Sequence, residues 1–295
     1  MSRPVLYYKA MRHVYSVAIA FILFGVGAFY YAQVFSYQPP TVVAHFEPVF
    51  TVKTDAAPTL RASAYIIFDT DSGEVLAAAD PDTVHPIASI TKLFTATAIL
   101  ELFDPASTTT ITWGDIEAEG ESGKLKPAQV YSYRELLFPL LLESSNDAAL
   151  ALEHATKGEL TATLATVAEK YGATHAQFVD ASGLAKDNVA SARDLMAFSR
   201  AVGEKYPFVY DVSQLPQYIG EYTGWRNNNP VFNTDSYRGG KHGYTPDAGR
   251  TIVSQFSETF TGGERTIGYI ILGSDNLAVD VATLRGFVAE SVQYQ

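Results

Sequence analysis

Two pairs of strand-like segments stand at opposite ends of the globular part of this chain, with a long helical block between them. Residues 64–68 and 74–78 flank the turn residues of 69–73, and residues 250–256 and 265–273 form a second pair. Neither pair alone makes a sheet large enough to be stable. We therefore predict one antiparallel sheet built from both pairs and flanked by helices, an α/β chain of the α+β kind, with an all-helical subdomain inserted between its halves.

The inserted subdomain is expected at about residues 104–210, where apolar side chains recur at helical spacing. A helix over 93–103 precedes it and is apolar on nearly every side, which is typical of a buried helix. A last helix is predicted over 277–292. Because 47% of the 295 residues are hydrophobic, the composition supplies a sizeable core.

The N-terminal segment has the pattern of a membrane anchor. Residues 14–32 carry no charged side chain, and this run is long enough to cross a bilayer as a helix. Only basic charges precede it, so the positive-inside rule places residues 1–13 in the cytoplasm. We expect a transmembrane signal-anchor over 14–35 that sits in the lipid bilayer and holds the rest of the chain outside the cytoplasm.

A cleaved signal peptide is the alternative, because Val26-Gly27-Ala28 has the small residues of a cleavage site. The apolar run continues through Phe29–Tyr31, and interfacial aromatic residues of this kind favour an uncleaved anchor. Residues 36–60 contain several prolines without a clear period, which indicates an extended stalk or linker. The globular domain is then expected over 61–295.

The composition excludes several classes of function. The net charge is −11, and the exported part has 18 basic against 32 acidic residues once the three N-terminal cations are set aside, which argues against a nucleic-acid partner. The chain has no cysteine, so disulfides, thiol catalysis and cysteine-ligated metals are excluded. The 6 histidines show none of the spacings of a metal site, so a metal site has little support.

A candidate nucleophile and base lie at the start of the apolar helix, in Ser89-Ile90-Thr91-Lys92. Residues three apart in a helix share a face, so the Ser89 hydroxyl and the Lys92 amine are within reach of each other. A desolvated lysine can take the proton that makes a serine hydroxyl nucleophilic. Because a Ser-x-x-Lys pattern often arises by chance, its meaning depends on partners elsewhere in the chain.

Two further motifs lie where helices or strands break. Ser144-Ser145-Asn146 separates two predicted helices, where a serine can relay a proton and an asparagine can bind an amide, although such residues are also common helix caps. Gly239–Thr245 precedes or begins the first returning strand. There Lys241 can attract a carboxylate and backbone N–H groups can stabilise an oxyanion, although a glycine-rich turn with a solvated lysine is the simpler interpretation of this motif alone.

Together the three motifs resemble the Ser-x-x-Lys, Ser-x-Asn and Lys-x-Gly order of penicillin-binding proteins and serine β-lactamases. The longer strings that carry the resemblance are Pro86–Lys92, Leu140–Ala149, Phe178–Leu184 and Lys241–Gly249. They are similar to those of the D-alanyl-D-alanine carboxypeptidase family of low-molecular-weight penicillin-binding proteins, from about Ala62 to the C-terminus. The resemblance implies a β-lactamase/transpeptidase-like fold and a bacterial cell-membrane enzyme that faces the cell wall and is inhibited covalently by β-lactams.

By this resemblance, Ser89 attacks the carbonyl of the penultimate D-alanine in a peptidoglycan stem peptide, with Lys92 as base and Ser144 as proton relay to the leaving D-alanine. The resemblance also implies that the backbone N–H groups of Ser89 and Tyr244 would form the oxyanion hole and that water would hydrolyse the acyl-enzyme. It implies no metal or organic cofactor. The implied substrate-binding residues are Asn146, Lys241, His242, Gly243, Tyr244 and Thr245.

The chain departs from the family pattern in two places. His242 stands where a threonine is usual, and because a histidine is larger and able to carry a proton, the substrate carboxylate would be bound in a changed geometry. This bears on substrate choice more than on reaction class. Many relatives also add a β-rich domain and a C-terminal amphipathic anchor, which the N-terminal span is expected to replace here.

Three alternatives remain open. A D,D-endopeptidase that cuts peptidoglycan crosslinks would use the same chemistry. A β-lactamase is disfavoured, because no Glu-x-x-Leu-Asn string lies between Asn146 and Lys241. A wall-binding or scaffold protein on a catalytically impaired fold is favoured only by His242.

Overall fold

The computed structural model describes residues 18–27, 29, 49–53, 57–120 and 123–295, and the chain divides into two units, 1–47 and 48–295. In the first unit, residues 18–27 are helical and exposed. The predicted cytoplasmic segment and most of the predicted anchor lie outside the described residues. Within the described part of the chain, no helix combines the length and the apolar character needed to cross a membrane.

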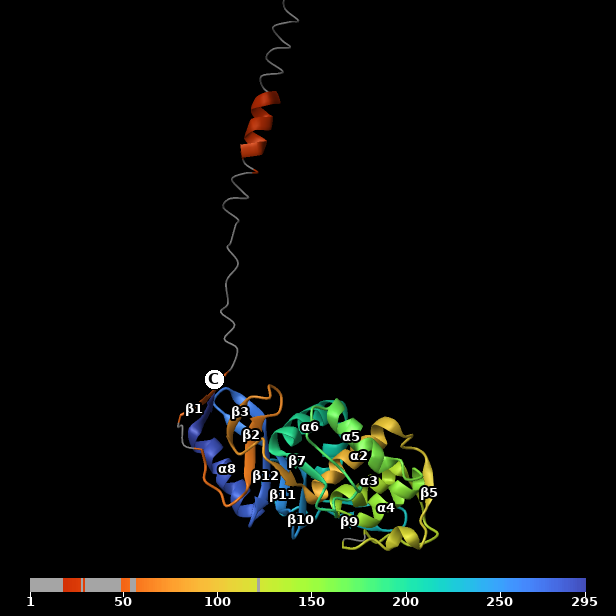
Figure 1. Cartoon of the computed structure of the whole chain (residues 1–295). Helices are drawn as coiled ribbons and strands as arrows, with labels where there is room; N and C mark the ends of the chain where they lie inside the picture. The colour runs from red at the N-terminus through yellow and green to blue at the C-terminus, as the bar shows by residue number, and fades with distance from the viewer. Residues whose placement is uncertain (1–17, 28, 30–48, 54–56, 121–122) are drawn as a thin grey trace, which may run out of the picture. The chain divides into compact units, whose positions relative to one another are not determined.

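The second unit is built on a five-stranded antiparallel sheet with the strand order β10-β11-β12-β2-β3 (Figure 1). Its strands are β2 (Ala64–Asp69), β3 (Val75–Ala79), β10 (Tyr237–Thr245), β11 (Gly249–Phe260) and β12 (Gly263–Ser274). Strands β12 and β2 pair so that Ile270 lies opposite Ile66, and this pairing joins the two ends of the domain sequence. The prediction of a single antiparallel sheet is therefore confirmed.

Alternating side chains give the sheet an apolar core on each face. Ile66 and Phe68 of β2 belong to the core shared with the helical block, whereas Tyr65 and Ile67 belong to the core shared with α8 (Leu277–Ser291). Helix α8 covers one face of the sheet and the helical block lies against the other (Figure 1). Strand β2 is buried along its whole length, because it lies between two strands and is covered on both faces of the sheet.

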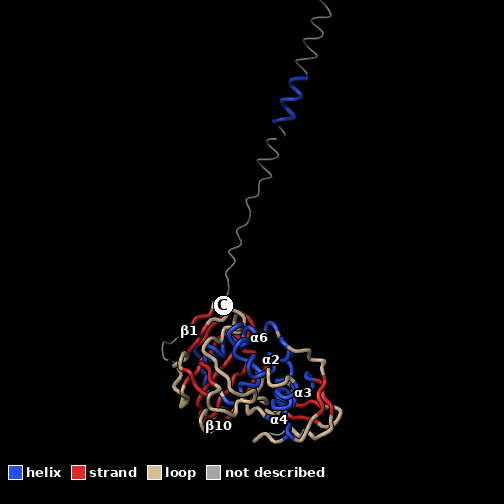
Figure 2. The backbone as a smooth tube through the Cα atoms, turned by 45° about the vertical axis from the view of Figure 1, so that its right-hand side comes forward, coloured by secondary structure: helices blue, strands red, loops and turns tan. Residues whose placement is uncertain are grey.

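The helical block surrounds a buried central helix, α2 (Thr91–Leu102). The other helices are α3 (Tyr133–Leu142), α4 (Asn146–Ala155), α5 (Leu160–Lys170), α6 (Ala192–Lys205) and α7 (Phe208–Gln214). The block differs from the predicted all-helical subdomain because short antiparallel ladders border it (Figure 2). They are β4 (Val84–Pro86) with β7 (Val189–Ser191), β5 (Thr108–Thr110) with β6 (Val130–Ser132), and β8 (Gln217–Ile219) with β9 (Gly224–Arg226). Three-residue strands are too short to show a clear period in sequence.

The folded unit begins earlier than the sequence indicated. Strand β1 (Phe50–Val52), inside the expected stalk of 36–60, pairs with strand β13 (Val292–Tyr294) beside the C-terminus. Phe50 is buried against Tyr294, with ring centroids 4.7 Å apart. The described end of the expected stalk is therefore part of the domain. The sequence did not indicate this, because the partner strand lies at the opposite end of the chain.

Candidate active site

Ser89 lies in a 3₁₀ turn, η1 (Ala88–Ile90), that leads directly into α2. Ala88 has a left-handed backbone, with φ of 50°, and the hydroxyl of Thr91 donates to its carbonyl at 2.8 Å. A left-handed alanine is strained, and such strain is often found where a catalytic side chain must be presented at a fixed angle. The sequence placed Ser89 in the first turn of the helix, and the structure places it just before that turn.

Lys92 is fully buried in the first turn of α2. Its Nζ donates to Ser89 Oγ at 3.0 Å, to Asn146 Oδ1 at 2.7 Å and to the carbonyl oxygen of Ser182 at 2.6 Å. A buried ammonium needs such partners, because an unpaired charge in the protein interior is very costly. The three contacts connect the candidate nucleophile, the second motif and a loop that follows α5.

The second motif lies in the break between α3 and α4. Ser144 has a left-handed backbone with φ of 61°, and Ser145 caps α4 by accepting from the backbone N–H of Ala148 at 3.0 Å. Because Ser145 provides the cap, Ser144 and Asn146 are left to face the cleft. The Asn146 carboxamide contacts Lys92 through Oδ1 and donates through Nδ2 to the carbonyl of Glu119 at 2.6 Å.

The third motif runs along β10, the edge strand of the sheet beside η1. Lys241 is buried, and its Nζ donates to the carbonyl of His242 at 2.6 Å. Gly243 passes so close to the nucleophile that an added Cβ would lie 2.5 Å from the backbone nitrogen of Ser89. The close approach requires glycine at this position, and it sets the strand edge directly against the serine turn.

His242 is uncharged at neutral pH. Burial is the main cause that lowers its pKa, and the neighbouring charges of Lys241, Lys92 and Arg250 lower it further, to about 2. The sequence alone indicated a side chain that is able to carry a positive charge. The structure instead gives a neutral imidazole, which offers one N–H donor and one acceptor.

A loop over 178–188, which contains the family-like string Phe178–Leu184, completes the site. The carboxylate of Asp180 accepts from the backbone N–H groups of Ser182, Gly183 and Ala185 at 2.7, 2.6 and 2.8 Å. Burial alone would raise the pKa of Asp180, but these hydrogen bonds outweigh burial and lower the pKa. An aspartate followed by serine and glycine is a turn signal, yet only the fold reveals that the Ser182 carbonyl meets Lys92.

A cleft of about 240 Å³ lies between these segments. Its walls include the predicted residues Ser89, Ser144, Asn146, His242, Gly243, Tyr244 and Thr245. Lys92 and Lys241 are buried beside it rather than in its lining. Asn228, which the sequence did not single out, also lines the cleft and bonds the carbonyls of Leu142 and Glu143 at 3.0 Å. The structure therefore brings the three motifs to one place.

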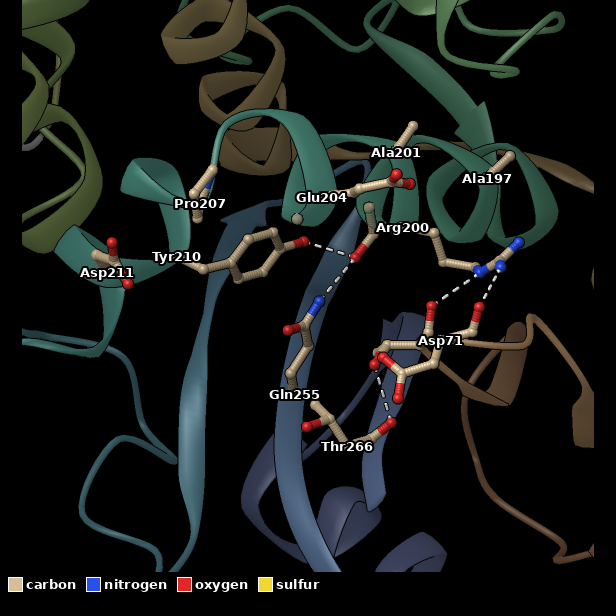
Figure 3. A pocket seen from close by; sticks show the side chains of 13 residues that line it. Asp71, Ala197, Arg200, Ala201, Glu204, Pro207, Tyr210, Asp211, Gln255 and Thr266 are labelled. Atoms are coloured by element: carbon tan, nitrogen blue, oxygen red, sulfur yellow. Dashed lines mark hydrogen bonds between the residues drawn. The ribbon is translucent and has the colours of Figure 1, made fainter. Parts of the chain in front are cut away.

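A larger cavity of about 730 Å³ lies apart from the cleft, between α6, α7 and the sheet (Figure 3). Tyr210 Oη and Ser199 Oγ are 2.5 Å apart, and Gln255 Nε2 donates to Ser199 Oγ at 3.3 Å. These hydrogen bonds connect α7 to β11 through Ser199 of α6. Ser213 of α7 in turn accepts from the backbone N–H of Gly240 at 2.9 Å, so α7 supports the start of β10. Among the described residues, no cluster of metal-ligating side chains is present.

Comparison with known proteins identifies the family. Residues 51–275 match the model of the family described as D-alanyl-D-alanine carboxypeptidase. The chain belongs to this family. Its identity to D-alanyl-D-alanine carboxypeptidase DacB2 of Mycobacterium tuberculosis is 32% over 221 residues, which cover 72% of this chain and 75% of the relative. Its identity to a D-alanyl-D-alanine endopeptidase of Escherichia coli is 28% over 228 residues, which cover 70% of this chain and 73% of that protein.

A solved structure agrees with this family assignment. Penicillin-binding protein D2 from Listeria monocytogenes, in its ampicillin-bound form, superposes with a TM-score of 0.68 at 25% identity, covering 77% of this chain and 97% of that chain. The resemblance inferred from the motifs, and the penicillin-binding fold that it implied, are therefore confirmed.

Proposed function

We propose that this protein is a serine-type D-alanyl-D-alanine carboxypeptidase, a hydrolase that removes the terminal D-alanine from peptidoglycan stem peptides outside the cytoplasm. The observation that carries the proposal is the 3.0 Å contact between Ser89 Oγ and Nζ of the buried Lys92, in a chain of the D-alanyl-D-alanine carboxypeptidase family. A buried amine one helical turn from a serine is a general base within reach of a nucleophile.

The ammonium form of Lys92, which donates to three acceptors, must first lose a proton. Acylation then begins when the neutral Nζ takes the proton of Ser89 Oγ. The oxygen attacks the carbonyl carbon of the penultimate D-alanine, and the C–N bond to the terminal D-alanine then breaks. Ser144 relays the proton from Lys92 to the departing amine. This half-reaction yields an ester on Ser89 and free D-alanine, and a water molecule hydrolyses the ester.

The edge of β10 supplies the groups that bind charge. Backbone N–H groups of Ser89 and Tyr244 stabilise the oxyanion, which the close approach of Gly243 to the Ser89 nitrogen supports. The buried Lys241 adds positive potential for the terminal carboxylate. Neutral His242 offers the carboxylate one N–H donor in place of a hydroxyl.

A covalent penicillin adduct tests the nucleophile. We expect labelled benzylpenicillin to modify the full-length protein and peptide mapping to place the label on Ser89. Ser89→Ala, shown by circular dichroism to be folded, should remain unlabelled. A label on another residue, or equal labelling of Ser89→Ala, would refute the assignment.

A D,D-endopeptidase activity is the second candidate, because relatives named D-alanyl-D-alanine endopeptidase match the chain almost as well as those named carboxypeptidase. Purified muropeptides separate the two activities. A carboxypeptidase releases free D-alanine from monomers, whereas an endopeptidase converts crosslinked dimers to monomers.

We further propose that the N-terminal segment anchors the enzyme to the cell membrane. The uncharged run of residues 14–32 supports this, as do the described helical residues 18–27, whose apolar side chains Ile19, Phe21, Ile22, Leu23, Phe24 and Val26 are all more than half exposed. Cell fractionation tests the proposal, since an anchored protein stays with the membranes after a high-salt wash.

A further inference from the structure

The turn that presents Ser144 to the cleft is strained. Ser144 is buried and has a left-handed backbone, with φ of 61°. A serine keeps this conformation only where contacts around it fix the backbone. The two residues before it, Leu142 and Glu143, stand at the end of α3, where the carbonyl groups have no donor within the helix. The conformation of Ser144 therefore depends on donors from elsewhere in the chain.

Asn228 supplies a donor to each of these two carbonyls. Its backbone N–H donates to the carbonyl of Leu142 at 3.0 Å, and its side-chain Nδ2 donates to the carbonyl of Glu143 at 3.0 Å. A contact also runs the other way, because the carboxylate of Glu143 accepts from the backbone N–H of Arg226 at 3.0 Å. Three hydrogen bonds thus join the residues directly before Ser144 to the segment 226–228.

The segment that carries Asn228 is itself fixed in the fold. Asn228 follows β9, and the asparagine on each side of it is buried. Asn227 Nδ2 donates to the carbonyl of Ser213 at 2.7 Å, and Asn229 Nδ2 donates to Tyr237 Oη at 3.0 Å. Asn228 differs from its two neighbours because it is exposed and lines the cleft. Its carboxamide therefore extends from a rigid support to the end of α3.

We propose that Asn228 is a positioning residue for the proton relay. By holding the carbonyls before Ser144, it keeps the Ser144 hydroxyl where it can pass the proton that Lys92 takes from Ser89 to the nitrogen of the departing D-alanine. The inference rests on the function proposed for Ser89 and Ser144. It predicts that Asn228 matters most when the leaving group must be protonated as its bond to the acyl carbon breaks.

Two leaving groups separate this role from a general effect on the fold or the cleft. An N-acylated D-alanyl-D-alanine peptide releases an amine, whose nitrogen needs a proton, whereas the matching depsipeptide with C-terminal D-lactate releases an oxygen that departs with far less help from a proton. The quantity to measure is kcat/KM, which reports the steps through acylation. In the full-length protein, Asn228→Ala should lower it about 10-fold for the peptide, the effect of roughly one hydrogen bond, and less than about 2-fold for the depsipeptide.

The matched control is Asn276→Ala. Asn276 is also an exposed asparagine whose side chain binds the backbone at a helix end, since its Oδ1 accepts from the backbone N–H of Val279 in α8 at 3.3 Å. This variant should leave the ratio of the two kcat/KM values unchanged. The double variant Ser144→Ala with Asn228→Ala should hydrolyse the peptide no more slowly than Ser144→Ala alone, because both changes act on the same proton transfer.

Equal losses with both substrates, an unchanged rate with the peptide, or losses that multiply in the double variant would overturn the proposal. Hydrogen exchange gives a readout that needs no catalysis. The backbone N–H of Ser145 donates to the carbonyl of Pro139 at 3.0 Å and so reports on the turn at Ser144. Its exchange should accelerate in Asn228→Ala and not in Asn276→Ala, and unchanged exchange would also count against the proposal. If the unsubstituted protein releases neither D-alanine nor D-lactate, the function proposed for Ser89 fails, and the exchange measurement still decides whether Asn228 holds the turn.

Discussion

At the scale of single residues, the site is organised by buried positive charge. Lys92 and Lys241 are 0% and 1% exposed, and both lie close to the cleft. Burial is the main reason that the pKa of His242 falls so far below its ordinary value, and the positive potential that favours a substrate carboxylate lowers it further by disfavouring another cation. Replacement of the family's threonine by histidine therefore adds bulk and a neutral donor rather than a charge.

The neutral state of His242 makes the stability of the protein sensitive to acid. The unfolded chain binds a proton at this histidine below about pH 6.5, whereas the folded protein does not until about pH 2. Stability is therefore lost as pH falls below 6.5, by up to about 2 kcal/mol at pH 5. Between pH 7.5 and pH 5, the free energy of unfolding of the unsubstituted protein should therefore fall by about 2 kcal/mol more than that of His242→Thr.

Urea unfolding at the two pH values measures this difference. The same variant should show an acylation rate whose pH profile between 5 and 9 has the same shape as that of the unsubstituted protein, because His242 does not titrate in that range. A profile that loses a step near pH 6.5 would mean that His242 is protonated in the folded state.

At the scale of elements, the serine turn η1 is held between the edge of β10 and the loop 178–188. Both neighbours approach through glycine: a Cβ on Gly243 would lie 2.5 Å from the Ser89 nitrogen, and one on Gly183 would lie 1.9 Å from the Ala88 carbonyl oxygen. The position of Ser89 thus depends on two segments far away in sequence. The loop also contributes the Ser182 carbonyl to Lys92, so its displacement would affect nucleophile and base together.

Gly183→Ala tests this dependence. Gly183 has φ of +87°, which disfavours a side chain, and the added methyl group would collide with backbone that cannot move freely. We expect acylation by benzylpenicillin to fall at least about 10-fold, in line with a displacement of roughly 1 Å at the site.

The control is Gly286→Ala in α8, where an added Cβ meets nothing within 4 Å. That change should leave acylation unaltered and raise stability by about 1 kcal/mol, because alanine is the better helix former. Comparable acylation by Gly183→Ala and the unsubstituted protein would show that the loop does not position the serine turn.

At the scale of the whole molecule, the folded unit is closed by the pairing of β1 with β13. Phe50 is the buried residue of β1, with its ring among those of Phe260 and Tyr294. The start of the folded unit at residue 48 coincides closely with the start of the family match at residue 51. The boundary of the domain is thus a tertiary contact rather than a change in composition.

Two truncations test this boundary. Removal of residues 1–47 should leave the melting temperature and the acylation rate of the remaining protein unchanged. Removal of residues 1–52 also deletes β1, and should cost about 2 kcal/mol for the lost burial of Phe50. Thermal unfolding compares the two, and equal melting temperatures would mean that β1 contributes no stability.

Features that depend on near neighbours or on complete motif strings could be predicted from the residues alone. The three-residue spacing of Ser89 and Lys92 predicted that they face each other, and the structure sets Oγ and Nζ 3.0 Å apart. The two pairs of strand segments predicted the sheet, and the motif strings predicted the family. Helical periodicity and hairpin turns are local properties, so they can be recognised without the fold.

The remaining features depend on how distant segments pack in the folded chain. Three contacts join segments that are distant in the chain: β1 pairs with β13, the Ser182 carbonyl accepts from Lys92, and the Glu119 carbonyl accepts from Asn146. The neutral state of His242 likewise depends on charges and burial that several segments create together. Such contacts are set by how the elements pack, and no local pattern of residues records them.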